Sequence, residues 1–384
     1  MRLTHVWLPQ HWGPGCWNPM YRGADSSAAV VREGTVAVGS YDGAVYFVNV
    51  TDPSLPVTRT PSGSRWGGEN SPDVLQNGTN RTVVTWGGMS SKSIVFIDAD
   101  KHTQLDEWSL PCSDHGSITS SGINVGTGRV FVGTNSDEKH KFIYSMDRNG
   151  DIWNTSADIT GAAFSSLGPL VIGDELVCFG IGGSVLWIQD LDSKLVCLHQ
   201  ELQAEGKQIK FVTERLGRQI QSKPAYSEEH SLIYVGDFDG TLHALDAETG
   251  KSRWNRTETE DWKHPKASGF VGSPTVVDDL VIIGSSNGRV YAYTADEGIK
   301  RWSSQIGDST GTWKMCLNCG VFSTPTSSRD NKTLYIGSSN GIWALEKESG
   351  AAKWFLYSGA TCASKPTLVE GGEGESDVIV AACR

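Results

Sequence analysis

The sequence has no long apolar run and no cluster of positive charge, and these absences exclude two kinds of partner. No segment approaches the roughly 18 consecutive apolar residues of a membrane-spanning helix, and the first nine residues lack the apolar core of a signal peptide. The 384 residues carry a formal net charge of -11, without a basic run. Because nucleic acids and anionic membranes bind clustered Lys and Arg, neither is expected as the main partner.

The familiar signatures of catalysis are also missing. The sequence contains no His-Glu-x-x-His cluster, no Gly-x-Ser-x-Gly motif and no phosphate-binding loop. What is abundant is glycine, with 44 residues, and tryptophan, with 14. Many glycines and aromatic residues without long amphipathic stretches indicate an all-β protein with many turns.

An internal repeat decides the fold class. Three segments, 231–254, 280–302 and 334–354, share one pattern: an apolar strand ending in Gly, an Asp-Gly or Asn-Gly turn, a second strand, a turn ending in Gly, and a strand ending in Trp. Weaker copies precede them, with Cys197 taken as the Trp equivalent in the fourth. The anchor glycines lie 46 to 56 residues apart, at Gly39, Gly87, Gly133, Gly180, Gly236, Gly284 and Gly337. That period is typical of a four-stranded propeller blade.

The pattern within each copy supports the same architecture. A strand such as Leu280–Ile283 is apolar on both faces, so it is expected to be covered on both sides by neighbouring blades. Asp-Gly and Asn-Gly predict type I′ hairpins, and each terminal Trp is expected to pack between blades. Seven copies span roughly 26 to 360. The remaining 24 and 25 residues at the two ends add up to one more blade. We therefore predict one domain, 1–384, folded as an eight-bladed all-β propeller of four-stranded antiparallel blades, with the last blade shared by the termini; the alternative is a truncated fragment with an open edge.

The repeat resembles the PQQ-like repeat of the quinoprotein alcohol dehydrogenase-like superfamily. The residues that carry the resemblance are Tyr-Val-Gly-x-x-Asp-Gly-x-Leu-x-Ala-Leu-Asp-Ala-x-Thr-Gly-Lys-x-x-Trp at 234–254 and its copies. For the enzymes of this superfamily, the resemblance implies pyrroloquinoline quinone (PQQ) held between a Trp face and a disulfide of adjacent cysteines, with a calcium ion bound by Glu, Asn and Asp. This sequence has no Cys-Cys dipeptide, and no such ligand set can be placed on the matching loops.

A non-catalytic binding or scaffold propeller is therefore the preferred interpretation, and no cofactor is expected. The alternative is an oxidoreductase, a PQQ- and calcium-dependent dehydrogenase. The loops between one blade and the next gather at the channel mouth and are expected to contact a protein, peptide, glycan or small ligand. The candidates for ligand binding are Trp66, His115, Trp262, His264 and Trp313, together with Lys223 and Lys365, which precede inner-strand prolines. The two lysines either bind an anion in the channel or are solvated or paired with carboxylates.

Asparagine and cysteine patterns bear on the compartment. Six Asn-x-Ser/Thr sequons favour a glycosylated chain of the secretory pathway, at Asn49, Asn77, Asn80, Asn154, Asn255 and Asn331. This would require that the signal sequence is missing from the gene model, and the alternative is coincidence in Thr-rich turns. Cys316 and Cys319 lack the further ligands of a zinc site, so a local disulfide or two buried thiols is expected. Cys178 and Cys197 fall in one predicted blade and can pair in an oxidising compartment.

Overall fold

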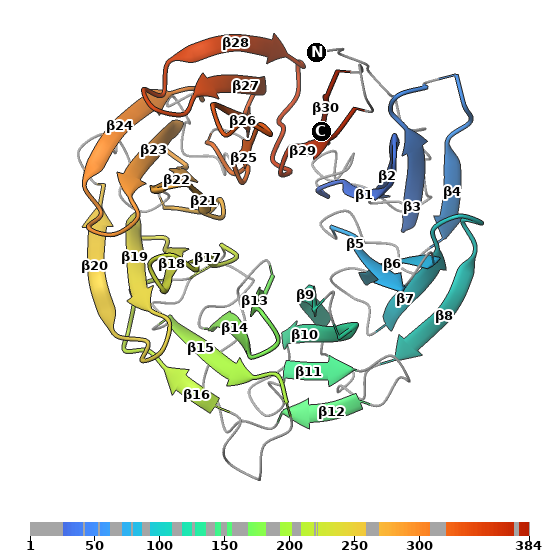
Figure 1. Cartoon of the computed structure of the whole chain (residues 1–384), viewed down its shortest axis with the longest axis horizontal. Helices are drawn as coiled ribbons and strands as arrows, with labels where there is room; N and C mark the ends of the chain where they lie inside the picture. The colour runs from blue at the N-terminus through green and yellow to red at the C-terminus, as the bar shows by residue number, and fades with distance from the viewer. Residues whose placement is uncertain are drawn as a thin grey trace, which may run out of the picture.

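The computed structural model describes most of the chain from residue 26 onward, and this part is all β. The described residues are 26–40, 43–52, 54–61, 71–77, 80–86, 93–109, 117–124, 127–135, 143–146, 152–155, 168–181, 193–201, 209–218, 220, 222–258, 269–307, 320–371 and 376–383. They contain seven four-stranded sheets and one two-stranded sheet, arranged as blades around a central axis (Figure 1). No helix in this part is long and apolar enough to cross a membrane.

Each blade consists of four consecutive strands, paired in sequence order. Blades one to three are β1 (Ala29–Arg32), β2 (Thr35–Ser40), β3 (Ala44–Asn49), β4 (Thr58–Pro61); β5 (Asp73–Asn77), β6 (Asn80–Trp86), β7 (Ser93–Asp98), β8 (Gln104–Ser109); and β9 (Ser117–Asn124), β10 (Arg129–Asn135), β11 (Ile143–Met146), β12 (Ile152–Thr155). Blades four and five are β13 (Leu170–Ile172), β14 (Leu176–Ile181), β15 (Lys194–His199), β16 (Ile209–Val212); and β17 (Ala225–Ser227), β18 (Leu232–Gly236), β19 (Thr241–Asp246), β20 (Ser252–Thr257). Blades six and seven are β21 (Thr275–Val277), β22 (Leu280–Gly284), β23 (Arg289–Thr294), β24 (Lys300–Gln305); and β25 (Thr326–Ser327), β26 (Thr333–Ser338), β27 (Gly341–Glu346), β28 (Ala352–Tyr357).

The alternation of strand direction gives the ring two distinct faces. All pairs within a blade are antiparallel, so the first and third strands run one way along the axis and the second and fourth run the other. The connections from first to second and from third to fourth strand therefore lie at one end, which we call the lower face. The connections from second to third strand, and from each blade to the next, lie at the upper face.

Blades pack through their apolar strands, and several also through an aromatic ring on the outer strand. All five residues of β22 are buried, as the doubly apolar pattern predicts. Trp254 and Trp302 are buried against the next blade, as predicted, and the indole of Trp302 donates to the carbonyl oxygen of Lys347 at 2.8 Å. The assignment of Cys197 to this position is wrong, because Cys197 lies in the third strand, β15. Phe211 takes the place instead, packed under the turn glycine Gly250 of blade five.

The predicted tight hairpins are present, but the type I′ assignment is wrong. In the β18–β19 turn the amide of Gly240 donates to the carbonyl of Asp237 at 3.2 Å, and Gly240 has φ +78°. A type I′ turn needs positive φ at both central residues, whereas Asp239, the residue before Gly240, is not among the residues with positive φ. The geometry is that of a longer loop closed by one left-handed glycine.

The prediction of eight blades is also wrong, since the propeller has seven four-stranded blades. The strands after blade seven, β29 (Thr367–Val369) and β30 (Val378–Val380), form a two-stranded sheet of three residues each, and within the described ranges no further strand pairs with it. Eight blades were predicted because the two terminal segments together have the length of one blade. A blade is defined by four hydrogen-bonded strands, and residue number carries no information on pairing. Residues 1–25 lie outside the described ranges.

The two-stranded sheet joins blade seven to blade one, as Figure 1 shows. The Lys365 amide donates to Ser27 Oγ at 3.0 Å, and Thr367 Oγ1 donates to the Ala28 carbonyl at 2.6 Å. Val369 and Val378 belong to the same apolar cluster as β2 and β3. The ends of the described chain therefore meet by side-chain packing and hydrogen bonds at the inner wall.

Candidate functional site

The central channel is lined by the start of each first strand, where a small residue usually precedes proline. Ser273 and Thr324 hold this position in blades six and seven, and their hydroxyl-bearing neighbours fasten one blade to the next. For example, Thr275 Oγ1 donates to the carbonyl of Pro325 at 2.7 Å. Small residues are expected here because the blades crowd toward the axis.

Two members of this ring are lysines instead, as the sequence indicated. Lys223 precedes β17 and Lys365 precedes β29, and these inner strands begin at the upper face, so both lysines lie at the upper end of the inner wall. Their backbone amides are fixed, with Lys223 N donating to Ser273 Oγ at 2.8 Å. Both residues are exposed to water. Among the described residues neither ammonium group has a hydrogen-bond or ion-pair partner. The predicted alternative, in which the lysines pair with carboxylates, is therefore not seen within this part of the chain.

The charge of one lysine affects the protonation of the other. Burial among the surrounding blades, and secondly the positive charge of Lys223, lower the pKa of Lys365. Blades six and seven separate the two lysines along the ring. The Lys365 side chain is exposed to solvent, yet the surrounding protein desolvates its ammonium group enough to lower the pKa.

A carboxylate from the far side of the ring joins the pair. Asp73, the first residue of β5 in blade two, is half-buried. Burial raises the pKa of its carboxyl group, and the charge of Lys223 partly offsets that rise. Asp73 belongs to blade two, Lys223 to blade five, and Lys365 precedes the two-stranded sheet. Asp73 and Lys365 are each affected by the charge of Lys223, and we call the three residues the channel cluster. The sequence analysis missed Asp73, although Ser71-Pro72-Asp73 matches the small-residue-Pro motif that drew attention to the lysines.

The channel cluster has the chemistry of a binding site. With all three groups ionised it carries one net positive charge, and its ammonium groups can donate to a carboxylate or a phosphate. No nucleophile with an adjacent base is seen at this place among the described residues. Within the same residues no three His, Cys, Asp or Glu side chains are grouped to hold a metal ion, and no two cysteines are adjacent in the sequence. These residues therefore fit a quinone–calcium centre poorly.

A buried histidine–carboxylate pair lies in blade five. His243 Nε2 is 2.8 Å from Asp237 Oδ2, and both side chains are buried. The other oxygen of Asp237 accepts from the amides of Asp239 and Thr241, at 2.8 and 2.9 Å. The pair therefore fastens the β18–β19 turn to the third strand. Blade six has a similar contact, from Asn287 Nδ2 to the hydroxyl of Tyr291, which supports a structural role.

Most of the other predicted site residues lie outside the described ranges. These are Trp66, His115, Trp262, His264, Trp313, Cys316 and Cys319. The predicted contact surface of the blade-to-blade loops therefore stays a prediction. The sequon asparagines lie within the described ranges. Asn49 ends β3, Asn77 and Asn80 flank the β5–β6 hairpin, Asn154 lies in β12, Asn255 in β20, and Asn331 in the β25–β26 turn.

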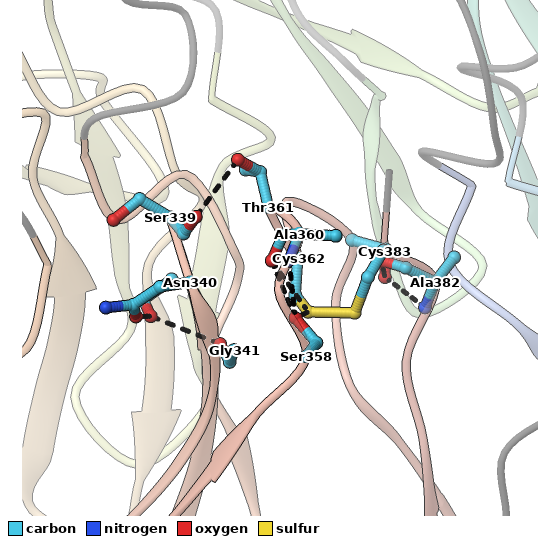
Figure 2. Close-up of a disulfide and its surroundings, with 11 residues drawn as sticks. Ser339, Asn340, Gly341, Ser358, Ala360, Thr361, Cys362, Ala382 and Cys383 are labelled. Atoms are coloured by element: carbon cyan, nitrogen blue, oxygen red, sulfur yellow. Dashed lines mark hydrogen bonds between the residues drawn. A yellow bond between two sulfur atoms is a disulfide. The ribbon is translucent and has the colours of Figure 1, made fainter.

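Two disulfides are present. Cys178 and Cys197 are directly paired across β14 and β15, which confirms their predicted pairing. Cys362 and Cys383 form a second bond, drawn in Figure 2, that the sequence analysis missed. Cys362 precedes β29 and its amide donates to the Ser338 carbonyl of blade seven at 2.9 Å. The bond therefore ties the end of the described chain to a segment anchored on blade seven.

Comparison with known proteins finds similarity to two kinds of protein, assembly factors and dehydrogenases. A family model described as outer membrane protein assembly factor BamB matches residues 173–360. The chain is 28% identical over 198 residues to methanol dehydrogenase [cytochrome c] subunit 1 of Paracoccus denitrificans, covering 49% of this chain and 30% of that protein. It is 30% identical over 128 residues to outer membrane protein assembly factor BamB of Shewanella oneidensis, covering 32% and 27%.

The chain thus spans less than a third of the length of either relative. Among solved structures, Sqt1 of Saccharomyces cerevisiae superposes with a TM-score of 0.68 over 94% of both chains, at 11% identity. At that identity the likeness concerns the fold alone.

Proposed function

Since the chain is a β-propeller of PQQ-like repeats, we propose that it is a binding module that holds an anionic group of its ligand at the upper mouth of the channel. The observation that carries this proposal is the convergence of Lys223 and Lys365. One ammonium group comes from blade five and one from the segment before the two-stranded sheet, and neither has a hydrogen-bond or ion-pair partner among the described residues, although the Asp73 carboxylate senses the charge of Lys223. Two positive charges held close enough to lower the pKa of one of them are typical of a site that binds an anion.

The ligand class follows from the groups available. Ammonium donors favour a carboxylate or phosphate as acceptor, and Asp73 can accept from a donor on the same ligand. An acidic peptide segment or a carboxylated small molecule meets both needs.

The test is a titration with small anionic probes. Binding of citrate and of inorganic phosphate is measured by isothermal titration calorimetry for the wild type and for Lys223→Gln and Lys365→Gln. Loss of one charge-assisted hydrogen bond, about 1.5–3 kcal/mol, corresponds to roughly a 10- to 100-fold weaker affinity. Lys251→Gln is the matched control, because Lys251 is an exposed lysine at the lower face. Equal affinity in all four proteins contradicts the proposal.

A second candidate function is a PQQ- and calcium-dependent dehydrogenase. It is supported by the similarity to methanol dehydrogenase subunit 1, and opposed by the lack of adjacent cysteines. Purified protein is supplied with PQQ and calcium, and dye-linked alcohol oxidation is followed with the cofactor's absorbance. Turnover would favour the enzyme. PQQ binding that depends on Lys223 and Lys365 without turnover would favour the binding module.

A further inference from the structure

The six sequons are distributed unevenly over the propeller. Four of them lie at the lower face: Asn49 ends a third strand, Asn77 and Asn80 flank a first-to-second hairpin, and Asn331 lies in another. The remaining two, at Asn154 and Asn255, lie within the outer strands β12 and β20, on the rim of the ring. None falls in a connection of the upper face.

The upper face does not lack asparagine, which makes the asymmetry informative. Asn287 and Asn340 lie in second-to-third-strand turns, and by sequence Asn70 and Asn318 fall between blades. None of the four is a sequon, because none has Ser or Thr two residues later. The tripeptides read Asn-Gly-Arg, Asn-Gly-Ile, Asn-Ser-Pro and Asn-Cys-Gly. Asparagine is therefore common to both faces, whereas the hydroxyl residue that makes a sequon is confined to the lower face and the rim.

The described sequon side chains are accessible to a modifying enzyme. Asn80 and Asn255 are exposed, and Asn49 and Asn331 are half-buried. Asn49 is held by its oxygen, which accepts from the hydroxyl of Thr51 at 3.0 Å and from the amide of the same residue at 3.1 Å, so its amide nitrogen stays available.

Asn331 uses one N–H for a bond to Asp278 Oδ1 at 3.0 Å and retains the other. Asn49 and Asn331 can therefore each form one new bond at Nδ2 and keep the hydrogen bonds described here.

We infer that Asn49, Asn80, Asn255 and Asn331 carry N-linked glycans, which cover the lower face and the rim and leave the upper face bare. In this reaction Nδ2 of the asparagine forms a bond to C1 of an oligosaccharide donated from a lipid pyrophosphate. The C1–O bond to the pyrophosphate breaks, and the lipid pyrophosphate leaves as the amide gives up one proton. No oxidant or reductant is needed.

The two disulfides point independently to the same compartment. Cys178–Cys197 and Cys362–Cys383 are bonds that persist in an oxidising environment, which is where sequons are glycosylated in secreted proteins. The second bond lies beside the inner wall at blade seven (Figure 2). A bulky, hydrophilic cover on one face also has a consequence for binding, because a macromolecular partner can then approach closely only from the upper face, where Lys223 and Lys365 stand.

The experiment maps glycan occupancy on the full chain, secreted from eukaryotic cells behind a cleavable leader. Peptide N-glycosidase removes each glycan and converts the modified asparagine to aspartate, which mass spectrometry of peptides detects. Conversion at Asn49, Asn80, Asn255 and Asn331 is the expected result. Recovery of these peptides with unmodified asparagine from a folded, secreted protein would overturn the inference.

Variants at one exposed site separate modification from folding. Thr257→Ala removes the Asn255 sequon and is expected to lose one glycan, whereas Thr257→Ser keeps a hydroxyl residue at that position and is expected to retain it. Both variants leave Asn255 itself in place on β20. An unchanged glycan count in Thr257→Ala would contradict occupancy at Asn255. Because the readout is a mass and no ligand is added, failure here is distinguishable from failure of anion binding in the channel.

Discussion

Trp302 and Trp354 occupy the same position in successive repeats, and the structure predicts different costs for removing them. Trp302 is buried at 8% exposure, and its indole donates to the Lys347 carbonyl of blade seven. Gly350 in the next turn lies flat against its ring. Trp354 stands before the two-stranded sheet, is half-buried, and has no hydrogen bond from its indole among the described contacts. Only the first ring is therefore fully covered by a following blade.

The expected magnitudes follow from burial. Removing a buried Trp side chain costs about 3–5 kcal/mol, so Trp302→Ala is expected to lose roughly 4 kcal/mol of unfolding free energy, including about 1 kcal/mol for the indole hydrogen bond. Trp354→Ala lacks that bond and part of the burial, and about 2 kcal/mol is expected. Urea unfolding followed by far-UV circular dichroism measures both. Equal losses in the two variants would refute the idea that the next blade supplies the difference.

Two further predictions concern a turn and an ion pair. Gly298 and Gly359 both have positive φ, but a Cβ at Gly298 would lie 2.6 Å from the Trp254 ring, whereas a Cβ at Gly359 would meet nothing nearer than 3.7 Å. In the same urea assay, Gly359→Ala is expected to lower the free energy of unfolding by about 1 kcal/mol, and Gly298→Ala by clearly more. Similar losses in the two variants would argue against close packing at Gly298. A hydrogen bond from Lys347 lowers the pKa of Asp278, so their pair stabilises the fold above the unfolded-state pKa and loses this effect as pH falls through the folded-state pKa. Asp278→Asn should therefore be less stable than the wild type at pH 7, with the gap closing in acid, and a gap that does not change with pH would contradict this.

The blade could be predicted from the sequence because its determinants are local. The apolar strand at 280–283, the Asn-Gly turn after it and the terminal Trp302 recur at a fixed period, and each has a direct structural meaning. The number of blades could not be predicted in the same way. Whether a terminal segment adds strands to a sheet depends on hydrogen bonding between residues far apart in the chain. The lengths of the terminal segments do not show whether such hydrogen bonds form.

The site shows the same division. Lys223 and Lys365 were identified because proline follows each of them at the start of a first strand. The Ser71-Pro72 motif before Asp73 was available in the sequence, but the influence of Lys223 on Asp73 depends on how blades two and five are placed in the fold. The bond between Cys362 and Cys383 was missed for a related reason: it closes around β29 and β30, and the sequence does not show how that pair of strands folds back.

The proposed anion site depends on Lys223 and Lys365 lying close enough for their charges to repel each other. Its most direct test is a pH titration of the lysine side-chain signals by NMR, in the wild type and in Lys223→Gln. We expect the pKa of Lys365 to lie below the usual range of a lysine and to rise when the charge at position 223 is removed. A pKa of Lys365 that is the same in both proteins would contradict the claim.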